Sequence, residues 1–184
     1  MSGQTIWLTG LSGAGKTTIA QALAVRLDLD GVPVQLLDGD ELRTNLSAGL
    51  GFSRADRDTH VRRVGFVAQL LARHGVTVIV PVIAPYEQAR AAVRDQHLGA
   101  GITYREVYVS TPLQICRERD VKGLYARSAR GELTAMTGVD DPYEPPLLPE
   151  MSIDTAHVPL GQAVDALLGL ARQNREITDE SEVA

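Results

Sequence analysis

The chain has 184 residues and a mass of 19.8 kDa, which fits one domain with a self-sufficient core. Its net charge of -5 offers no basic field for nucleic acid, and it has no run of 18 apolar residues that could span a membrane. The single cysteine, Cys116, excludes an internal disulfide, and the start lacks a signal-like stretch, so we expect a cytoplasmic protein. Of the 18 basic residues only Lys16 and Lys122 are lysine, which singles out these two positions.

Apolar strand-like runs alternate with longer helical patterns. In chain order they predict a strand over 5–9, a helix over 17–29, a strand over 34–37, helices over 41–46 and 54–74, a strand over 76–82, a helix over 87–98, a strand over 105–109, a helix over 113–120, a strand over 151–153 and a helix over 161–172. Residues 76–82 are almost wholly apolar and β-branched, as in a parallel strand buried on both faces. We therefore predict an α/β fold with a doubly wound, mostly parallel five-stranded sheet.

The stretch from Val121 to Pro149 interrupts this alternation with glycines, prolines and mixed charges. It is long for a connection, and long loops are usually functional or disordered. The acidic end of the chain, residues 176–184, is predicted to be disordered. The sequence therefore predicts one domain over 1–175.

A phosphate-binding motif follows the first predicted strand and opens the first helix. The motif is Gly10-Leu11-Ser12-Gly13-Ala14-Gly15-Lys16-Thr17, followed by Thr18. Its glycines let backbone N–H groups turn toward an anion, and the helix start adds a positive dipole end. Lys16 can neutralise the β- and γ-phosphates, and the Thr17 hydroxyl can bind Mg²⁺. The alternative, a glycine-rich turn without a ligand, fits this complete motif poorly, so we predict a P-loop that binds ATP.

Two carboxylates, Asp38 and Asp40, flank a glycine at the end of the second predicted strand. Ligands of open α/β sheets bind beyond the carboxyl ends of the strands, so both should face the P-loop. One carboxylate can orient Mg²⁺ while the other accepts a proton from an attacking hydroxyl. The structural alternative makes Asp40 the N-cap of the 41–46 helix.

Five arginines follow Asp40 closely: Arg43, Arg54, Arg57, Arg62 and Arg63. Guanidinium groups bind phosphate and sulfate in a fork geometry, so the cluster can hold an anionic second substrate. For any one of them, a solvated helix face is the alternative interpretation.

Further segments resemble one family over residues 4 to about 173. They are residues 10–18, Leu37-Asp38-Gly39-Asp40, residues 49–57, Arg62-Arg63, Ile83-Ala84-Pro85-Tyr86, Lys122-Gly123-Leu124-Tyr125, residues 137–144, Pro149-Glu150 and Asp154-Thr155. The chain resembles adenylylsulfate kinases, which phosphorylate the 3′-hydroxyl of adenosine 5′-phosphosulfate. The resemblance implies the three-layer P-loop NTPase fold, a mobile lid over about 121–146 and a homodimer.

The resemblance also implies a role for each matched position. Asp40 would contact the accepting hydroxyl and Asp38 would lie in the magnesium shell. The substrate would be held by Arg43 and Arg57 at its sulfate-phosphate end, by Phe52 at its adenine, and by Ile83, Lys122 and Leu124. Arg119 would pack on the adenine of ATP.

Three positions depart from the family pattern. Ala84 replaces a serine that many members carry, which closes any route through a phosphoserine and leaves direct transfer. His60 stands where an asparagine usually contacts the substrate, and Met136 stands where a phenylalanine would cover its adenine.

The leading hypothesis is an Mg²⁺-dependent kinase of adenylyl sulfate. His60 and Met136 leave open a related kinase of another anionic nucleotide. A nucleotide-binding switch would need a guanine-reading Asn-Lys-x-Asp, which the sequence lacks, and an inactive relative would have lost a catalytic group such as Lys16 or Asp40.

Overall fold

Five strands form one sheet in the computed structural model, which describes residues 3–173. The strands are β1 (Gln4–Thr9), β2 (Val34–Leu36), β3 (Thr77–Pro81), β4 (Thr103–Val109) and β5 (Met151–Ile153), in the spatial order β2-β3-β1-β4-β5. Every pair is parallel, for example Ile6 opposite Ile79 and Arg105. The predicted doubly wound sheet is confirmed, and it is wholly rather than mostly parallel.

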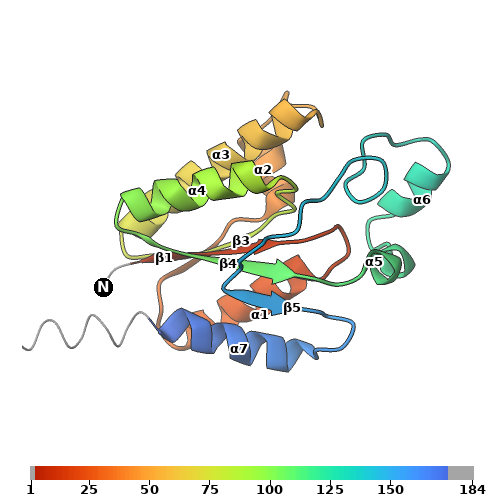
Figure 1. Cartoon of the computed structure of the whole chain (residues 1–184). Helices are drawn as coiled ribbons and strands as arrows, with labels where there is room; N and C mark the ends of the chain where they lie inside the picture. The colour runs from red at the N-terminus through yellow and green to blue at the C-terminus, as the bar shows by residue number, and fades with distance from the viewer. Residues whose placement is uncertain (1–2, 174–184) are drawn as a thin grey trace, which may run out of the picture.

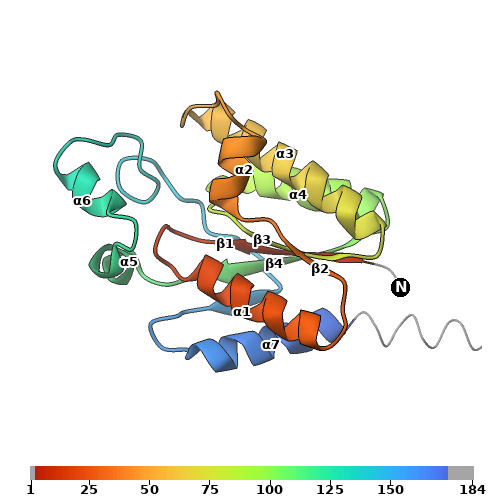
Figure 2. The ribbon, with the colours of Figure 1, turned by 180° about the vertical axis from the view of Figure 1, so that it is seen from behind.

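Helices cover both faces of this sheet and complete three layers (Figure 1). On one face lie α1 (Lys16–Leu29) and α7 (Leu160–Arg172); on the other lie α3 (Arg54–Arg73) and α4 (Glu87–Gly99), with α2 (Gly39–Asn45) beside them. Figure 2 shows the same layers from behind, with α5 (Leu113–Arg119) and α6 (Leu124–Ala129) beyond the end of the sheet. No described helix is long and apolar enough to cross a membrane.

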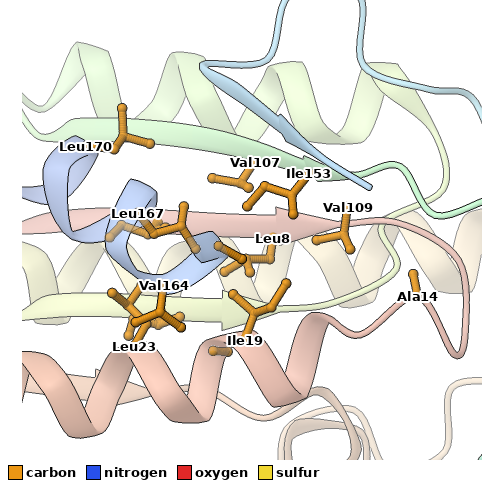
Figure 3. Packing of buried hydrophobic residues seen from close by; sticks show 14 of the residues in the cluster. Leu8, Ala14, Ile19, Leu23, Val107, Val109, Ile153, Val164, Leu167 and Leu170 are labelled. Atoms are coloured by element: carbon orange, nitrogen blue, oxygen red, sulfur yellow. The ribbon is translucent and has the colours of Figure 1, made fainter. Parts of the chain in front are cut away.

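Each face of the sheet has its own hydrophobic cluster. The cluster on the α1 and α7 side includes Leu8, Leu23 and Leu167, each fully buried (Figure 3). The cluster on the opposite side is built around Trp7, Val64 and Val80. Burying such side chains contributes roughly 1.5–3 kcal/mol each relative to exposure, so the two clusters hold the strand ends in fixed positions.

The described elements agree with the predicted ones except at a few positions. The second helix begins at Gly39, because the cap is Asp38 and not Asp40: the Asp38 carboxylate accepts hydrogen bonds from the backbone N–H of Asp40 (2.9 Å) and of Glu41 (3.4 Å). Pro112 is the N-cap of α5, which ends at Arg119, one residue before the predicted end. Leu70 of α3 is 38% exposed, although it lies at helical spacing from the buried Val64.

The segment expected to be a lid contains an unpredicted helix, α6. The Asp120 carboxylate accepts hydrogen bonds from the backbone N–H of Tyr125 and Ala126, each 2.9 Å, and these bonds hold the helix start. The predicted tail, 176–184, lies outside the described residues, and the extent of the domain, 1–175, stays a prediction.

Candidate active site

A cavity of about 930 Å³ lies at the carboxyl edge of the sheet. The P-loop after β1, α2 after β2, the turn after β3 and the segment 119–137 all contribute to its wall. Predicted site residues that line it are Ser12, Gly13, Gly15, Lys16, Thr17, Thr18, Asp38, Asp40, Arg43, Phe52, Arg57, His60, Ile83, Arg119, Lys122, Leu124 and Met136. One chamber of this size can take two small anionic ligands side by side.

Three predicted P-loop residues do not line the cavity and support the loop from behind. Gly10 has φ +148, and an added Cβ would lie 2.5 Å from the Val109 carbonyl oxygen, so only glycine fits there. Ala14 is buried, and its carbonyl oxygen accepts hydrogen bonds from the hydroxyls of Thr111 (3.0 Å) and Thr155 (2.9 Å). Leu11 packs against the α1-side cluster. These contacts fix the loop while Gly13, Gly15 and Lys16 face the cavity.

The Lys16 ammonium lies inside this loop. Its Nζ donates to the carbonyl oxygens of Gly10 (2.9 Å) and Leu11 (2.7 Å), and the residue is only 8% exposed. Burial lowers the pKa of Lys16 to about 8, because a low-dielectric setting disfavours the ammonium form. Polyphosphate oxygens placed in the loop would stabilise that charge, so the site is suited to an anion.

Asp38 and Asp40 reach the cavity in different ways. One oxygen of the Asp38 carboxylate caps α2, which fixes the side chain beside the P-loop. The Asp40 side chain is 74% exposed and forms an ion pair with Lys122, which belongs to the segment expected to be the lid. The two residues that the sequence singled out, Lys16 and Lys122, thus line the same cavity.

An arginine–aromatic cluster forms the wall beyond Asp40. The guanidinium carbon of Arg43 lies 4.8 Å from the centre of the Phe52 ring and that of Arg57 lies 5.5 Å from it. The Phe52 ring is held by these cation–π contacts although the residue is 55% exposed. Two guanidinium groups beside an exposed ring can hold an anion and a base of one nucleotide.

Arg57 is more constrained than the sequence indicates. It is 7% exposed, and it donates to the carbonyl oxygens of Phe52 (2.9 Å) and Ala135 (2.5 Å) and to the Thr137 hydroxyl (2.9 Å). The carboxylate of Asp141 lies 3.7 Å from its Nε. Arg57 therefore ties α3 to the far part of the lid segment, a role that side-chain type and spacing did not reveal.

The remaining predicted residues complete the two ends of the cavity. Met136, 6% exposed, and the partly buried Leu124 line it while packing against the α1-side cluster. Arg119 lies beside the P-loop, where it donates to the Thr155 hydroxyl (2.6 Å) and the Thr155 carbonyl oxygen (3.0 Å). Ile83 follows β3 and adds an apolar wall.

Comparisons with known proteins agree with this geometry. The family model for adenylylsulphate kinase matches residues 2–154. The chain belongs to the adenylylsulphate kinase family. It is 54% identical over 167 residues to the adenylyl-sulfate kinase of Chloroflexus aurantiacus (91% of this chain and 88% of that protein) and 56% identical over 153 residues to that of Rippkaea orientalis (83% and 82%). The chain is thus a phosphotransferase.

A solved structure from the same family has the same fold. The structure of the Mycobacterium tuberculosis APS kinase CysC, in complex with AMPPNP and APS, is 42% identical with a TM-score of 0.91 and covers 94% of this chain and 99% of that chain. The three-layer P-loop fold predicted from sequence is thereby confirmed.

Two residues that brace the site of this adenylylsulphate kinase, Thr155 and Asp141, lie in segments that match the family, but no role was predicted for them from the sequence. Thr155 braces both Ala14 and Arg119, and its place two residues after the last strand was the available signal, because strand ends face the site. The Tyr86 hydroxyl donates its hydrogen bond to the Asp141 carboxylate, whose two oxygens lie 2.9 and 2.8 Å from it. Burial and this carboxylate raise the pKa of Tyr86 to about 12, so its hydroxyl stays a donor.

His60, a departure from the family pattern, is a neutral hydrogen-bonding residue in this site. It is 7% exposed and its Nδ1 lies 2.8 Å from the Ser47 hydroxyl. Burial, with the charges of Arg43 and Arg63, lowers the pKa of His60 to about 4. At neutral pH it can therefore donate or accept a hydrogen bond as asparagine does.

This pKa predicts a dependence of stability on pH. Since the folded-state pKa lies below the usual 6.5, the contribution is complete above about pH 6.5 and falls as the pH drops toward 4. Between pH 7.5 and 5 the unfolding free energy should fall by about 2 kcal/mol more in the native chain than in His60→Asn. Urea unfolding at both pH values measures this, with the exposed His74→Asn as control; parallel falls in all three proteins would contradict it.

Proposed function

We propose that this cavity transfers the γ-phosphoryl group of ATP to the 3′-hydroxyl of adenylyl sulfate, giving ADP and 3′-phosphoadenosine 5′-phosphosulfate for sulfate assimilation. The observation that carries the proposal is the meeting of a complete P-loop and the Asp40 carboxylate in one cavity of a chain that belongs to this family. The purified protein with both substrates should release ADP, and mass measurement should identify the 3′-phosphorylated product.

The P-loop side of the cavity is the proposed ATP site. Backbone N–H groups of residues 10–18 surround the phosphates, and the Lys16 ammonium neutralises the bridging and γ-phosphoryl oxygens as charge develops on them. Arg119, held by Thr155, presents the flat face of its guanidinium to the adenine.

Thr17 and Asp38 are the residues that would hold Mg²⁺. The described residues contain no cluster of three or more histidine, cysteine or acidic side chains that could hold a metal. One hydroxyl and one carboxylate are nevertheless suited to Mg²⁺, which takes oxygen ligands and completes its shell with phosphates and waters. When bound with ATP, the ion would offset charge on the β- and γ-phosphates. Thr17 and Asp38 both line the cavity, and the cap of α2 fixes Asp38 in place.

The α2 and α3 side of the cavity is the proposed site of adenylyl sulfate. Asp40 orients the 3′-hydroxyl and accepts its proton, while Arg43 and Arg57 neutralise the phosphosulfate. The adenine lies between Phe52 and Met136, with His60, Ile83, Lys122 and Leu124 around it. With Ala84 in place of a serine, the acceptor oxygen attacks the γ-phosphorus directly, the bond to the ADP oxygen breaks, and the proton passes to Asp40.

Arg57→Ala should raise the KM for adenylyl sulfate by about tenfold or more, and the KM for ATP much less. The variant loses both a cationic partner of the phosphosulfate and the bonds from α3 to Ala135 and Thr137. Steady-state kinetics with each substrate varied in turn will show the split. Arg62→Ala, an exposed position on the same helix outside this cavity, is the matched control. An effect on ATP alone would contradict the assignment.

A related kinase of another anionic nucleotide is the second candidate function. It is favoured by His60 and Met136, since the thioether of Met136 covers a base with less selectivity than an aromatic ring. A panel of nucleotides assayed for ADP release separates the two, because a much higher kcat/KM for another acceptor would replace adenylyl sulfate.

We further infer a cytoplasmic homodimer. The expectation of two copies comes from the family resemblance, and one relative, the APS kinase from Thiobacillus denitrificans, is described as hexameric. That relative is 39% identical with a TM-score of 0.71, and the match covers 95% of this chain but 29% of that chain. Size-exclusion chromatography with light scattering measures the mass of the assembly in solution; a monomer or a hexamer would contradict the homodimer.

A further inference from the structure

Arg90 is a buried cation behind the cavity rather than in its wall. It lies on α4, is 2% exposed, and is absent from the described residues that line the cavity. A guanidinium group cannot lose its charge in a protein, so its burial requires partners on every side. Its position one turn into α4 lets it reach both the sheet and the turn after β3.

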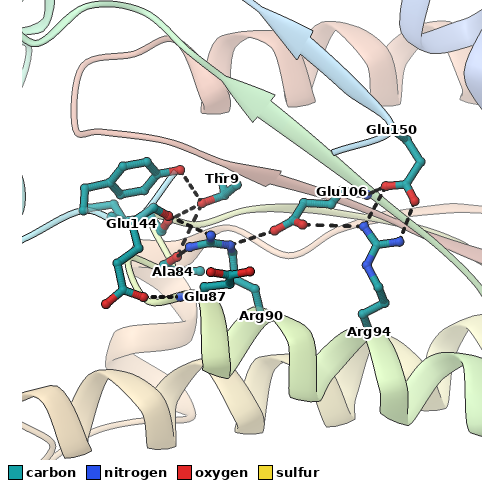
Figure 4. Close-up of polar contacts among 10 residues, drawn as sticks. Thr9, Ala84, Glu87, Arg90, Arg94, Glu106, Glu144 and Glu150 are labelled. Carbon is teal, nitrogen blue, oxygen red and sulfur yellow. Dashed lines mark hydrogen bonds and ion pairs between the residues drawn. The ribbon is translucent and has the colours of Figure 1, made fainter. Parts of the chain in front are cut away.

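The side of Arg90 that faces the sheet belongs to an ionic network (Figure 4). Its Nε lies 2.8 Å from the Glu106 carboxylate on β4. Arg94, one turn further along α4, contacts the same carboxylate at 3.5 Å and binds Glu150 with two nitrogens at 2.5 and 2.8 Å. Glu150 also accepts a hydrogen bond of 2.6 Å from the Glu106 backbone N–H. This network fixes the guanidinium of Arg90 relative to β4.

The other side of Arg90 joins two segments that are far apart in the chain. One terminal nitrogen donates to the Ala84 carbonyl oxygen and the other to the Glu144 carbonyl oxygen, each at 2.7 Å. Ala84 follows Ile83 in the cavity wall, and Glu144 lies near the end of the segment 121–146 that is expected to be the lid. The Arg90 side chain therefore bridges the wall after β3 and the end of the lid.

The turn that Arg90 holds is strained. Ala84 has φ +42, a left-handed conformation that is unfavourable for a residue with a Cβ. Such a conformation persists only where neighbours fix it, and Arg90 bonds its carbonyl oxygen directly. The Thr9 hydroxyl donates to the preceding carbonyl, that of Ile83, at 2.5 Å. Ile83 therefore depends on both partners for its place in the cavity.

The end of the lid is attached to the same turn by further bonds. The Glu144 backbone N–H donates to the Pro85 carbonyl oxygen (2.8 Å), and its carboxylate accepts from the Glu87 backbone N–H (2.7 Å). The Tyr143 hydroxyl lies 2.9 Å from that of Thr9, and the Arg90 guanidinium carbon lies 5.9 Å from the Tyr143 ring centre. Residues 143–144, called the lid root below, are thus fixed against the turn after β3.

We propose that Arg90 is a positioning residue for phosphoryl transfer: through Ala84 and Glu144 it fixes the acceptor-side wall and the lid root at the separation that adenylyl sulfate requires. It touches neither substrate. The proposal rests on the proposed function, in which Ile83 and the lid segment hold the acceptor, while ATP is held by the P-loop, to which Arg90 is not bonded.

Arg90→Lys tests this, because one ammonium can pair with Glu106 but cannot also hold two carbonyl oxygens in the fork geometry of a guanidinium. We expect the KM for adenylyl sulfate to rise about tenfold or more, with the KM for ATP changed less than about threefold. The matched control is Arg94→Gln, which weakens the same network without touching Ala84 or Glu144; it should lower the melting temperature and leave both KM values near those of the native chain. Equal effects on both substrates, or an equal effect of Arg94→Gln on the acceptor, would overturn the proposal.

Two further measurements cover other outcomes. If Arg90→Lys does not fold, the double variant Arg90→Met with Glu106→Leu removes the buried pair without leaving an unpaired charge. It should show the same selective rise in the KM for adenylyl sulfate. A folded double variant with native KM values overturns the proposal.

Hydrogen exchange tests the proposal without an activity assay. The Glu144 amide should exchange faster in Arg90→Lys than in the native chain or in Arg94→Gln, and unchanged exchange also overturns the proposal. If the native chain makes no product, but the Glu144 amide still exchanges faster in Arg90→Lys than in the native chain, the result would refute the proposed function alone.

Discussion

Lys16→Ala should lower kcat by at least about a thousandfold, because it removes the one cation that the P-loop places among the transferring phosphates. The carbonyl oxygens of Gly10 and Leu11 hold the Lys16 ammonium inside the loop, where the proposed site places the phosphates. Its loss leaves the substrates bound mainly by backbone groups and arginines. Single-turnover assays with saturating ATP will measure the effect on the chemical step.

The fold should survive the same substitution. Burial opposes the ammonium form of Lys16 and lowers its pKa to about 8, so removing the side chain also removes a desolvation cost. We expect a melting temperature within a few degrees of the native value. The control is Arg26→Ala on the same helix, an exposed partner of Asp165 outside the cavity, which should leave kcat unchanged. A Lys16→Ala protein that keeps a tenth of the native kcat would contradict the role assigned to Lys16.

Local patterns predicted the parts of the fold that depend on local chemistry. The apolar run around Val78 and Val80 predicts a central strand because a parallel strand is buried on both faces, and it is. The spacing of Ile19, Leu23 and Leu27 predicts the buried face of α1, because residues four positions apart lie on the same face of a helix. The structural alternative at α2 placed the cap at Asp40, two residues too late, since Asp38 and Asp40 are both good caps and only the backbone conformation decides between them.

Parts of the site that depend on contacts between distant segments could not be read from spacing. Arg57 looked like one of five similar arginines, but its bonds to Ala135 and Thr137 join residues nearly eighty positions apart. The role of Arg90 was not predicted either, because the residue pattern over 87–98 indicates only a helix. Short α6 was missed because its start depends on the Asp120 carboxylate and not on an apolar stripe.

Asp40→Asn should lower kcat by about a hundredfold to ten-thousandfold, because the amide keeps the shape of the carboxylate but cannot accept the proton of the 3′-hydroxyl. The KM values should change much less, since Asp40 is exposed at the edge of α2 and the arginines supply most of the acceptor's binding. Glu41→Gln is the matched control: it makes the same chemical change at the next position, in the same turn of α2 and outside the cavity wall. A near-normal kcat in Asp40→Asn would refute its role as the base.

The ion pair between Asp40 and Lys122 offers a competing explanation that one more variant can separate. If Asp40 acted only by holding the lid through Lys122, then Lys122→Met, which breaks the same pair and leaves the carboxylate in place, would cost as much activity as Asp40→Asn. If Asp40 is the base, Lys122→Met should act chiefly on the KM for adenylyl sulfate and retain most of kcat. Combining the two substitutions sharpens the distinction, because a shared anchoring role makes the double variant no worse than either single one, whereas separate roles make the losses add.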